Sequence, residues 1–287
     1  MKTGIYAVTG ATGHVGRVVA DKLKVQGHEV RPVSRSAGVD LDDAVALDRA
    51  FSGADGAFIM IPPEVKAADL RPRQIEVGLK LASAVKKAGT HRIVFLSSGN
   101  AQYEKGTGPI LGLHDMEERL NALGLAELVH LRPSFFMENH LGAIGLIAQA
   151  GIYGTAFRPD APLPMNATRD VGDIAAEFLT EDPFRQPRIW ESLGARDYTM
   201  AEATHILGAA IGKPDLKYVQ FSYDEARKAM IGFGLSASYA DSMMELTRSV
   251  NEGKLHSPTR SPENTTPTTL EQFAEEVFRK AFEAATA

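Results

Sequence analysis

Short apolar runs alternate with amphipathic stretches of helical spacing along the first half of the chain. Residues 5–8, 56–61 and 93–96 are continuous runs followed at once by Thr-Gly, Pro-Pro or Ser-Ser, which is typical of strands buried on both faces of a parallel sheet. Between them apolar residues recur with helical spacing, first at Val15, Val18, Val19 and Leu23. With further strands over residues 28–35 and 124–133, the pattern predicts an α/β fold built on a Rossmann-type, doubly wound parallel sheet.

Three finer predictions concern the same half. The few residues after residue 35 leave room only for a stub of a third strand, which we place at Val39-Asp40-Leu41. Asp42 is a candidate N-cap for a helix over residues 43–51. A long helix is predicted over residues 70–88, with its apolar stripe at Ile75, Leu79, Ala82 and Val85.

The pattern loosens after residue 140. The predicted elements are a helix over 141–150, a proline-rich loop over 158–165, a helix begun by Thr168 or Asp170, a strand over 188–193, a helix begun by Thr199 with a capping box to Glu202, a strand over 216–221, helices over 223–230 and 236–252, and a closing helix over 270–285. We therefore expect a sheet domain over residues 1–140, joined again by about 166–180, and a smaller mixed α/β lobe over residues 141–287.

Composition removes several classes of function. The 287 residues carry a formal net charge of -5, so no basic surface is expected for direct contact with nucleic acid or an anionic membrane. The chain has no cysteine, which excludes disulfides and thiolate chemistry, and no metal-ligand spacing is evident. No apolar run is long enough to cross a bilayer, and the first strand begins too early for a signal peptide. We expect a cytoplasmic protein.

A glycine-rich turn lies between the first strand and the first helix, in the sequence Thr9-Gly10-Ala11-Thr12-Gly13-His14-Val15-Gly16. Gly10 would permit a sharp turn, Gly13 a close approach of the backbone to a phosphate, and Gly16 tight packing of helix on strand. The loop from Gly10 through Thr12, Gly13, His14 and Val15 therefore predicts a pyrophosphate site at the helix start. The spacing is G-x-x-G-x-x-G, and a tight turn without a ligand is the alternative.

The end of the second strand bears on the choice of cofactor. An NAD site has an acidic residue there for the ribose 2′-hydroxyl, whereas this chain has Ser34-Arg35 and no carboxylate before Asp40. A hydroxyl and a guanidinium suit a 2′-phosphate, so we expect NADP(H) in preference to NAD(H). The alternative is that Arg35 is a solvated loop residue.

Two further strand ends should border the same cleft, because ligands lie beyond the carboxyl ends of parallel strands. Ile61, Pro62 and Pro63 follow one apolar run, and Ser97 and Ser98 follow the next. All five are predicted cofactor-binding residues.

Three segments together resemble one protein family. They are Thr9-Gly10-Ala11-Thr12-Gly13, a helix that carries His114 with Glu117 and Glu118, and Leu131-Arg132-Pro133-Ser134-Phe135-Phe136-Met137-Glu138-Asn139. Their order and spacing over about the first 140 residues are similar to the NmrA-like family of atypical short-chain dehydrogenase/reductases. The resemblance implies an NADP-binding sheet domain with Asp40 and Leu41 beside the adenine. It also implies that the Asp170-Val171-Gly172-Asp173 segment ties the small lobe to the sheet in a structural role.

The resemblance also implies a departure. Most short-chain reductases carry a tyrosine and, four residues later, a lysine as a proton relay. With His114 in the lysine position, Ile110 takes the tyrosine position and cannot move a proton; Tyr103 has the wrong spacing. His114 is the candidate catalytic residue, hydrogen-bonded to the nicotinamide ribose or to the substrate. The alternative is a histidine on the helix surface near Asp115.

Aromatic residues and methionines suggest where a substrate would bind. Phe135 and Phe136 are expected to wall the nicotinamide pocket, with Met137 and Asn139 reaching the substrate; core packing is the alternative for the first three. Arg132 is read as structural. Phe233 and Tyr239, together with Met243 and Met244, are candidates for a roof over the substrate, or else for core or a dimer face.

Three functions remain open at this stage. The leading hypothesis is an NADPH-dependent reductase of a conjugated, quinone-like or aromatic small molecule, in which solvent supplies the proton. The second is a non-catalytic NADP(H)-sensing regulator, and the third an isomerase or lyase with bound NADP. The full C-terminal lobe favours a substrate pocket, and a homodimer is possible.

Overall fold

A six-stranded parallel sheet forms the centre of the first domain. The computed structural model describes residues 3–125, 127–181 and 188–287. The strands lie in the order β2-β1-β3-β4-β5-β9 with every pairing parallel, which confirms the doubly wound α/β fold. Their bounds are β1 Ile5–Thr9, β2 Glu29–Val33, β3 Gly56–Met60, β4 Arg92–Leu96, β5 Glu127–Pro133 and β9 Arg188–Ser192.

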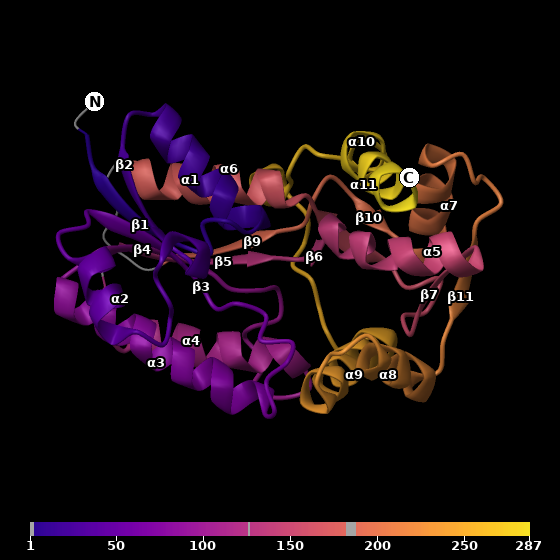
Figure 1. Ribbon diagram of the computed structural model, residues 1–287, viewed down its shortest axis with the longest axis horizontal. Helices are drawn as coiled ribbons and strands as arrows, with labels where there is room; N and C mark the ends of the chain where they lie inside the picture. Colours follow the sequence, from indigo (N-terminus) through magenta and orange to yellow (C-terminus); the bar gives the residue numbers. More distant parts are fainter. Residues whose placement is uncertain (1–2, 126, 182–187) are drawn as a thin grey trace.

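Helices cover both faces of this sheet (Figure 1). One face carries α1 (His14–Val25) and α6 (Thr168–Thr180), and the other carries α2 (Ala44–Phe51), α3 (Leu70–Ala88) and α4 (Leu111–Asn121). Alternate residues of each strand enter the two cores: on β3, Phe58 packs with α1 and α6, whereas Ile59 packs with the other three helices. This two-sided burial explains why the strands read as continuous apolar runs.

A smaller lobe follows β5 and lies beyond the carboxyl ends of the strands (Figure 1). It contains a three-stranded sheet of β6 (Phe135–Phe136), β8 (Leu163–Asn166) and β10 (Asp197–Tyr198), and a pair formed by β7 (Ile152–Thr155) and β11 (Lys217–Gln220). Its helices are α5 (Ile144–Ala150), α7 (Met200–Ala210), α8 (Tyr223–Gly232), α9 (Ala237–Asn251), α10 (Leu270–Phe273) and α11 (Arg279–Thr286), the last two joined by a π-helical turn, Ala274–Phe278. Short 3₁₀ helices occur at Arg35–Ala37, Gly108–Ile110, Met137–Ala143 and Pro262–Asn264.

The expected third strand is absent: residues 39–41 form no strand in the structure. A 3₁₀ turn, Arg35–Ala37, ends at Gly38 in the left-handed region, and the Asp40 carboxylate accepts a hydrogen bond from the Asp42 N–H. These local turn bonds replace a strand ladder, so β2 is the edge of the sheet.

Three details of the helices differ from the predictions. Asp43 caps α2, whereas Asp42 pairs with Arg73 and Lys80 on α3. Ala82 and Val85 of the predicted stripe of α3 are buried, but the side chain of Leu79 is exposed, because Val77 and Leu81 face the core in its place. The helix predicted over residues 141–150 is α-helical only from Ile144; a 3₁₀ helix precedes it.

Candidate functional site

The sheet reverses its winding at β1, because β2 and β3 lie on opposite sides of it. Ligands of doubly wound sheets bind beyond the strand ends at such a switch point. The Gly10–Gly13 loop follows β1 here, and Ile61, Pro62 and Pro63 follow β3. A 2.6 Å hydrogen bond from the Met60 N–H to the Thr9 hydroxyl joins the two strand ends. The structure therefore brings the predicted phosphate loop and the Ile-Pro-Pro segment to the same edge of the sheet.

The loop after β1 needs glycine at two positions for steric reasons. Gly10 has φ +62°, and a Cβ on it would lie 2.8 Å from the Met60 sulfur. A Cβ on Gly16 would lie 2.3 Å from the Gly10 carbonyl oxygen. Gly13, by contrast, has φ -81° and is the N-cap of α1.

The first turn of α1 has free N–H groups. Gly13 offers no side-chain acceptor to α1, and among the described residues the N–H groups of His14 and Val15 have no acceptor. Several other helices are capped by a side chain, as α2 is by Asp43 and α9 by Ser236. Unpaired amides at a helix start bind anions, so this turn fits a pyrophosphate.

The segment after β2 carries a guanidinium without a partner. Arg35 is exposed, and its guanidinium makes no hydrogen bond or ion pair with any described residue, while the Ser34 hydroxyl lies 3.1 Å from that of Ser36. The Asp40 carboxylate is already engaged in its turn, and Leu41 packs against the core. The guanidinium that is predicted to bind the 2′-phosphate is therefore available to an anion, and the next carboxylate in the sequence, Asp40, accepts one hydrogen bond within its own turn.

An ion-pair cluster holds the same segment against α3. Asp42 accepts hydrogen bonds from Arg73 at 2.8 and 2.9 Å and from Lys80 at 2.7 Å. These hydrogen bonds hold the pKa of the Asp42 carboxyl well below its usual range. The turn that follows Arg35 is thus tied to the helix after β3.

The two serines after β4 differ in environment. Ser97 is buried, and its hydroxyl donates to Glu117 at 2.5 Å, whereas Ser98 is half-buried. Glu117 also accepts two bonds from the Arg132 guanidinium. Burial acts to raise the pKa of Glu117, but Arg132, His130 and Ser97 outweigh it and hold that pKa below its usual value. Arg132 has a structural role, as predicted, and the Ser97 hydroxyl is already hydrogen-bonded to the Glu117 carboxylate.

His114 lies on α4 with its ring oriented by the backbone. Its Nδ1–H donates to the Ala101 carbonyl oxygen at 2.8 Å. Because a carbonyl only accepts, Nδ1 carries the proton and Nε2 of the neutral ring is a free acceptor. Ile110, one turn earlier, is buried. The histidine is thereby joined to the loop that follows β4.

The residues after β5 separate into different environments. Phe135 is half-buried, and its ring lies 5.4 Å from that of His140 and 6.1 Å from that of Phe157. Phe136 packs against the core under α1 and α6. Met137 lies fully within the core of the small lobe, as the alternative interpretation held, and Asn139 is exposed.

The residues proposed as a roof over the substrate lie on or beside α8 and α9, in different environments. Phe233 lies between these helices with 78% of its area exposed. Tyr239, in the first turn of α9, is half-buried, and burial raises the pKa of its phenol. Met243 and Met244 pack into a small cluster with Ala226, so they are core residues.

Helix α9 links the small lobe to loops of the sheet domain. Ser236 N–H donates to the Val65 carbonyl, and the Ser238 hydroxyl accepts from the Leu70 N–H. Glu245 accepts from the Gly106 N–H. Tyr239 is therefore held beside the segments that follow β3 and β4.

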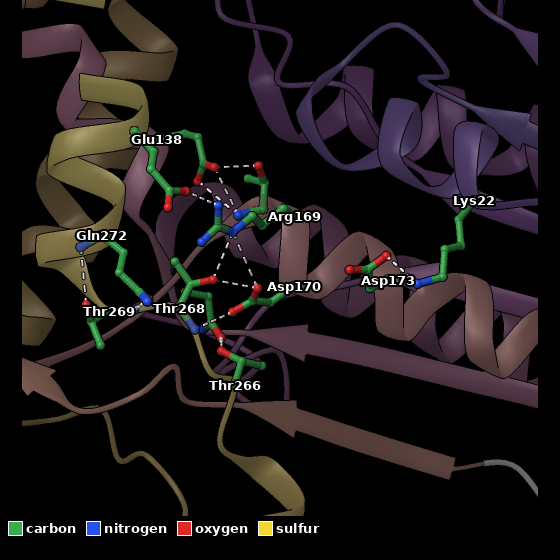
Figure 2. A network of polar contacts seen from close by, with 12 residues as sticks. Lys22, Glu138, Arg169, Asp170, Asp173, Thr266, Thr268, Thr269 and Gln272 are labelled. Atoms are coloured by element: carbon green, nitrogen blue, oxygen red, sulfur yellow. Dashed lines mark hydrogen bonds and ion pairs between the residues drawn. The ribbon is translucent and has the colours of Figure 1, made fainter. Parts of the chain in front are cut away.

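A polar network joins α6 to both lobes (Figure 2). The N-cap of α6 is Ala167, which has no capping side chain; instead Glu138 accepts from the Thr168 N–H and hydroxyl. The prediction that Thr168 or Asp170 caps this helix is wrong, because the acceptor comes from a distant segment. Asp170 accepts two bonds from Thr268, and Asp173 pairs with Lys22 on α1, which are structural roles as expected.

A small pocket of about 160 Å³ lies between α1, the start of α6 and the closing helix. His14 and Arg17 line it from α1, and Glu138 and Arg169 line it from the network. Of the predicted cofactor residues, only His14 borders this pocket. The sequence did not predict Arg17 and Glu138 as pocket residues. Arg17 lies one turn after the glycine loop, and Glu138 follows the aromatic segment.

The described residues contain neither a cluster of metal-ligand side chains nor a membrane-spanning helix. No group of three or more His, Asp or Glu side chains in the described part of the chain is arranged to hold a metal ion. None of the described helices combines the length and apolar character needed to span a bilayer.

Known proteins match the whole fold. An NAD(P)H azoreductase of Xenophilus azovorans is 27% identical over 256 residues, covering 83% of this chain and 85% of the relative. NADPH-dependent quinone oxidoreductase QOR2 of Escherichia coli, solved with NADPH, has a TM-score of 0.75 at 21% identity over 95% of this chain and 99% of its own. NmrA, a negative transcriptional regulator solved with NAD, has a TM-score of 0.76 at 19% identity over 99% and 98%. The model of the NmrA-like family matches residues 2–283, and the chain therefore belongs to the NmrA-like family.

Proposed function

We propose that this protein is an NADPH-dependent reductase of a conjugated, quinone-like or aromatic small molecule. The observation that carries the proposal is the uncapped first turn of α1, directly behind the glycine loop at the switch point of the sheet. Its free N–H groups fit a dinucleotide pyrophosphate. The azoreductase and the quinone oxidoreductase among the similar proteins support the reaction class.

The preference for NADPH rests on the end of β2. The Arg35 guanidinium has no partner among the described residues, and Ser34 precedes it. An arginine paired with a phosphate contributes more binding free energy than a neutral hydrogen bond. No carboxylate directly follows β2 for a 2′-hydroxyl, since the first one after Arg35 is Asp40, which accepts a hydrogen bond within its own turn.

The residues of the chain bind and orient, while the cofactor supplies the reducing power. NADPH, when bound, donates a hydride from its nicotinamide ring. The loop from Gly10 to Val15 would hold the pyrophosphate and Phe135 would border the nicotinamide, while His114, whose Nδ1–H donates to the Ala101 carbonyl, would offer its Nε2 to a ribose hydroxyl. Because Ile110 cannot move a proton, water supplies the one proton that completes the two-electron reduction.

The alternative proposal is a regulator that binds NADP(H) without catalysis. Two observations favour it: the similarity to NmrA and the buried Ile110 in the position of the usual tyrosine. Such a protein would use the same phosphate loop and Arg35 but would turn over no acceptor.

One experiment separates these proposals. The protein is titrated with NADPH and NADH by fluorescence and then assayed for NADPH oxidation with a panel of quinones and azo dyes. We expect NADPH to bind more tightly than NADH and at least one acceptor class to be reduced. Tight NADPH binding without turnover of any acceptor would favour the regulator.

Arg35→Ala tests the cofactor assignment. Loss of one charge-assisted contact should weaken NADPH binding about 10- to 100-fold and leave NADH binding unchanged. Arg49→Ala is the matched control, because Arg49 is an exposed arginine on the neighbouring α2. Equal affinity of the wild-type protein for both nucleotides would overturn the 2′-phosphate assignment.

A further inference from the structure

The loop after β4 contains an asparagine in an uncommon backbone conformation. Asn100 has φ +70°, and it is the one non-glycine residue with positive φ in the described part of the chain. Glycine adopts this region at the lowest cost, and asparagine tolerates it better than most residues. The loop has asparagine here although glycine occupies the preceding position.

The side-chain amide of Asn100 has no partner among the residues that the structure describes. Its Oδ1 is buried and accepts no hydrogen bond, and no described residue accepts from its Nδ2. A primary amide brings two donors on Nδ2 and an acceptor on Oδ1. The unpaired Nδ2 of Asn100 is not among the buried atoms of the described residues, so this donor, and not the buried Oδ1, is available to a ligand.

Three hydrogen bonds fix the position of Asn100 at the cleft. Gly99 N–H donates to the Pro133 carbonyl at the end of β5, and Ala101 N–H donates to the Ser98 carbonyl. The Ala101 carbonyl accepts from the ring of His114. Asn100 thus lies between the ends of β4 and β5 and the helix that carries His114, the candidate catalytic residue.

We propose that the Asn100 amide binds the acceptor and donates a hydrogen bond to its carbonyl oxygen or azo nitrogen. This inference rests on the proposed reductase function and assigns the donor that Ile110 cannot supply. The hydride forms a new bond at one end of the conjugated acceptor, the displaced electron pair moves to the oxygen or the distal nitrogen, and that atom takes a proton from water. The amide stabilises the negative charge that collects there.

The proposal predicts a difference between substrate classes. A quinone or an azo dye develops negative charge on an oxygen or nitrogen during reduction. A triarylmethyl-cation dye becomes neutral when its central carbon takes the hydride, so it gains nothing from a hydrogen-bond donor. Asn100 therefore matters for the first class and not for the second.

Two substitutions separate this role from that of a turn residue. Asn100→Gly keeps the left-handed backbone and removes the amide. Asn100→Asp keeps the size and the tolerance of positive φ but puts a negative carboxylate where the donor was. If the residue served the turn alone, both variants would behave like the wild type.

The experiment measures kcat/KM for a quinone and for a cationic triarylmethyl dye, together with NADPH affinity and the midpoint of urea unfolding. We expect Asn100→Gly to lower kcat/KM for the quinone about 10- to 100-fold, with dye turnover, NADPH affinity and the midpoint unchanged. Asn100→Asp should lower quinone turnover further. If the glycine variant does not fold, the aspartate variant alone provides the comparison of quinone with dye.

Each other result has a defined meaning. An active wild-type protein whose Asn100→Gly variant reduces the quinone at the wild-type rate overturns this inference and leaves the reductase proposal standing. Equal losses for quinone and dye overturn the charge-stabilising role. A wild-type protein that reduces none of the acceptors with NADPH overturns both the reductase proposal and the role of Asn100.

Discussion

The glycines after β1 differ in what their missing side chains permit. A Cβ on Gly16 would lie 2.3 Å from the Gly10 carbonyl oxygen and 2.9 Å from that of Thr9, so glycine is needed there for the chain to fold. A Cβ on Gly13 would lie 3.3 Å from the Gly10 carbonyl and would project from the N-cap of α1, where an anion would approach. Folding and binding thus depend on different glycines.

This division predicts two separable variants. Gly16→Ala should lower the free energy of unfolding by about 1–3 kcal/mol, because backbone atoms must move to admit the methyl group. Gly13→Ala should leave that free energy nearly unchanged and weaken NADPH binding at least about tenfold, roughly 1.4 kcal/mol. Urea denaturation and nucleotide titration measure the two effects. Gly142→Ala is the control, since a Cβ there meets nothing within 4 Å. If Gly16→Ala and Gly13→Ala weakened NADPH binding equally and neither changed stability, the separate roles of the two glycines would be contradicted.

Single residues show where sequence reasoning succeeds and where it stops. The glycine loop could be predicted because its function follows from local backbone geometry. The commitment of Ser97 to Glu117 could not, since it depends on α4 and β5 meeting behind the serine. Asn100 was missed for a related reason: an unpaired amide becomes visible only when every neighbour is placed.

At the scale of the element, α6 depends on distant segments for its polar partners (Figure 2). Asp170 is buried and accepts from the N–H of Thr268 at 2.9 Å and from its hydroxyl at 2.7 Å. Asp173, one turn later, forms a half-exposed pair with Lys22. These two carboxylates, three positions apart, should contribute very differently to stability.

Asp170→Asn should lower the free energy of unfolding by about 1–3 kcal/mol, because one acceptor oxygen becomes a donor amide facing another donor. Asp173→Asn should cost at most about 1 kcal/mol, since exposed pairs contribute little. Urea denaturation at neutral pH and moderate salt compares the two variants. Similar losses for both would show that burial does not control these contacts.

The elements themselves were largely predictable, with exceptions of one kind. Long periodic segments such as α3 and the apolar strands follow from spacing alone. The third strand, the cap of α2 and the cap of α6 were predicted wrongly, because turns and distant acceptors compete with the local pattern. The Asp40 turn excludes a strand, and Glu138 caps a helix thirty positions away in sequence.

At the scale of the molecule, the sheet domain and the small lobe have separate apolar cores. Helix α9 and the network at α6 connect them across the cleft. The sequence indicated a second lobe by its looser pattern, and the family resemblance implied that the Asp170–Asp173 segment ties it to the sheet. The contacts of α9 were not predicted, because they join residues more than ninety positions apart. The small-lobe core also encloses a polar pair, in which the fully buried His140 lies beside the Tyr153 hydroxyl.

That pair predicts how the stability of the whole chain depends on pH. Burial lowers the pKa of His140 to about 3, whereas an unfolded histidine titrates near 6.5. Below about pH 6.5 the unfolded chain therefore binds more protons, so stability is lost as the pH falls towards 3 and is unaffected by this residue above that range. His130, also buried with a lowered pKa, acts in the same direction.

The measurement compares the wild type with a His140→Leu/Tyr153→Phe double variant, which removes both partners and leaves neither buried group unpaired. Between pH 7.5 and pH 5 the wild type should lose about 2 kcal/mol through His140, and the double variant should lose correspondingly less. Carboxylates with lowered pKa, such as Glu117, remain ionised in both states over most of this window, so they add little to the slope. An unchanged pH slope in the double variant would show that His140 is not the group that titrates on unfolding.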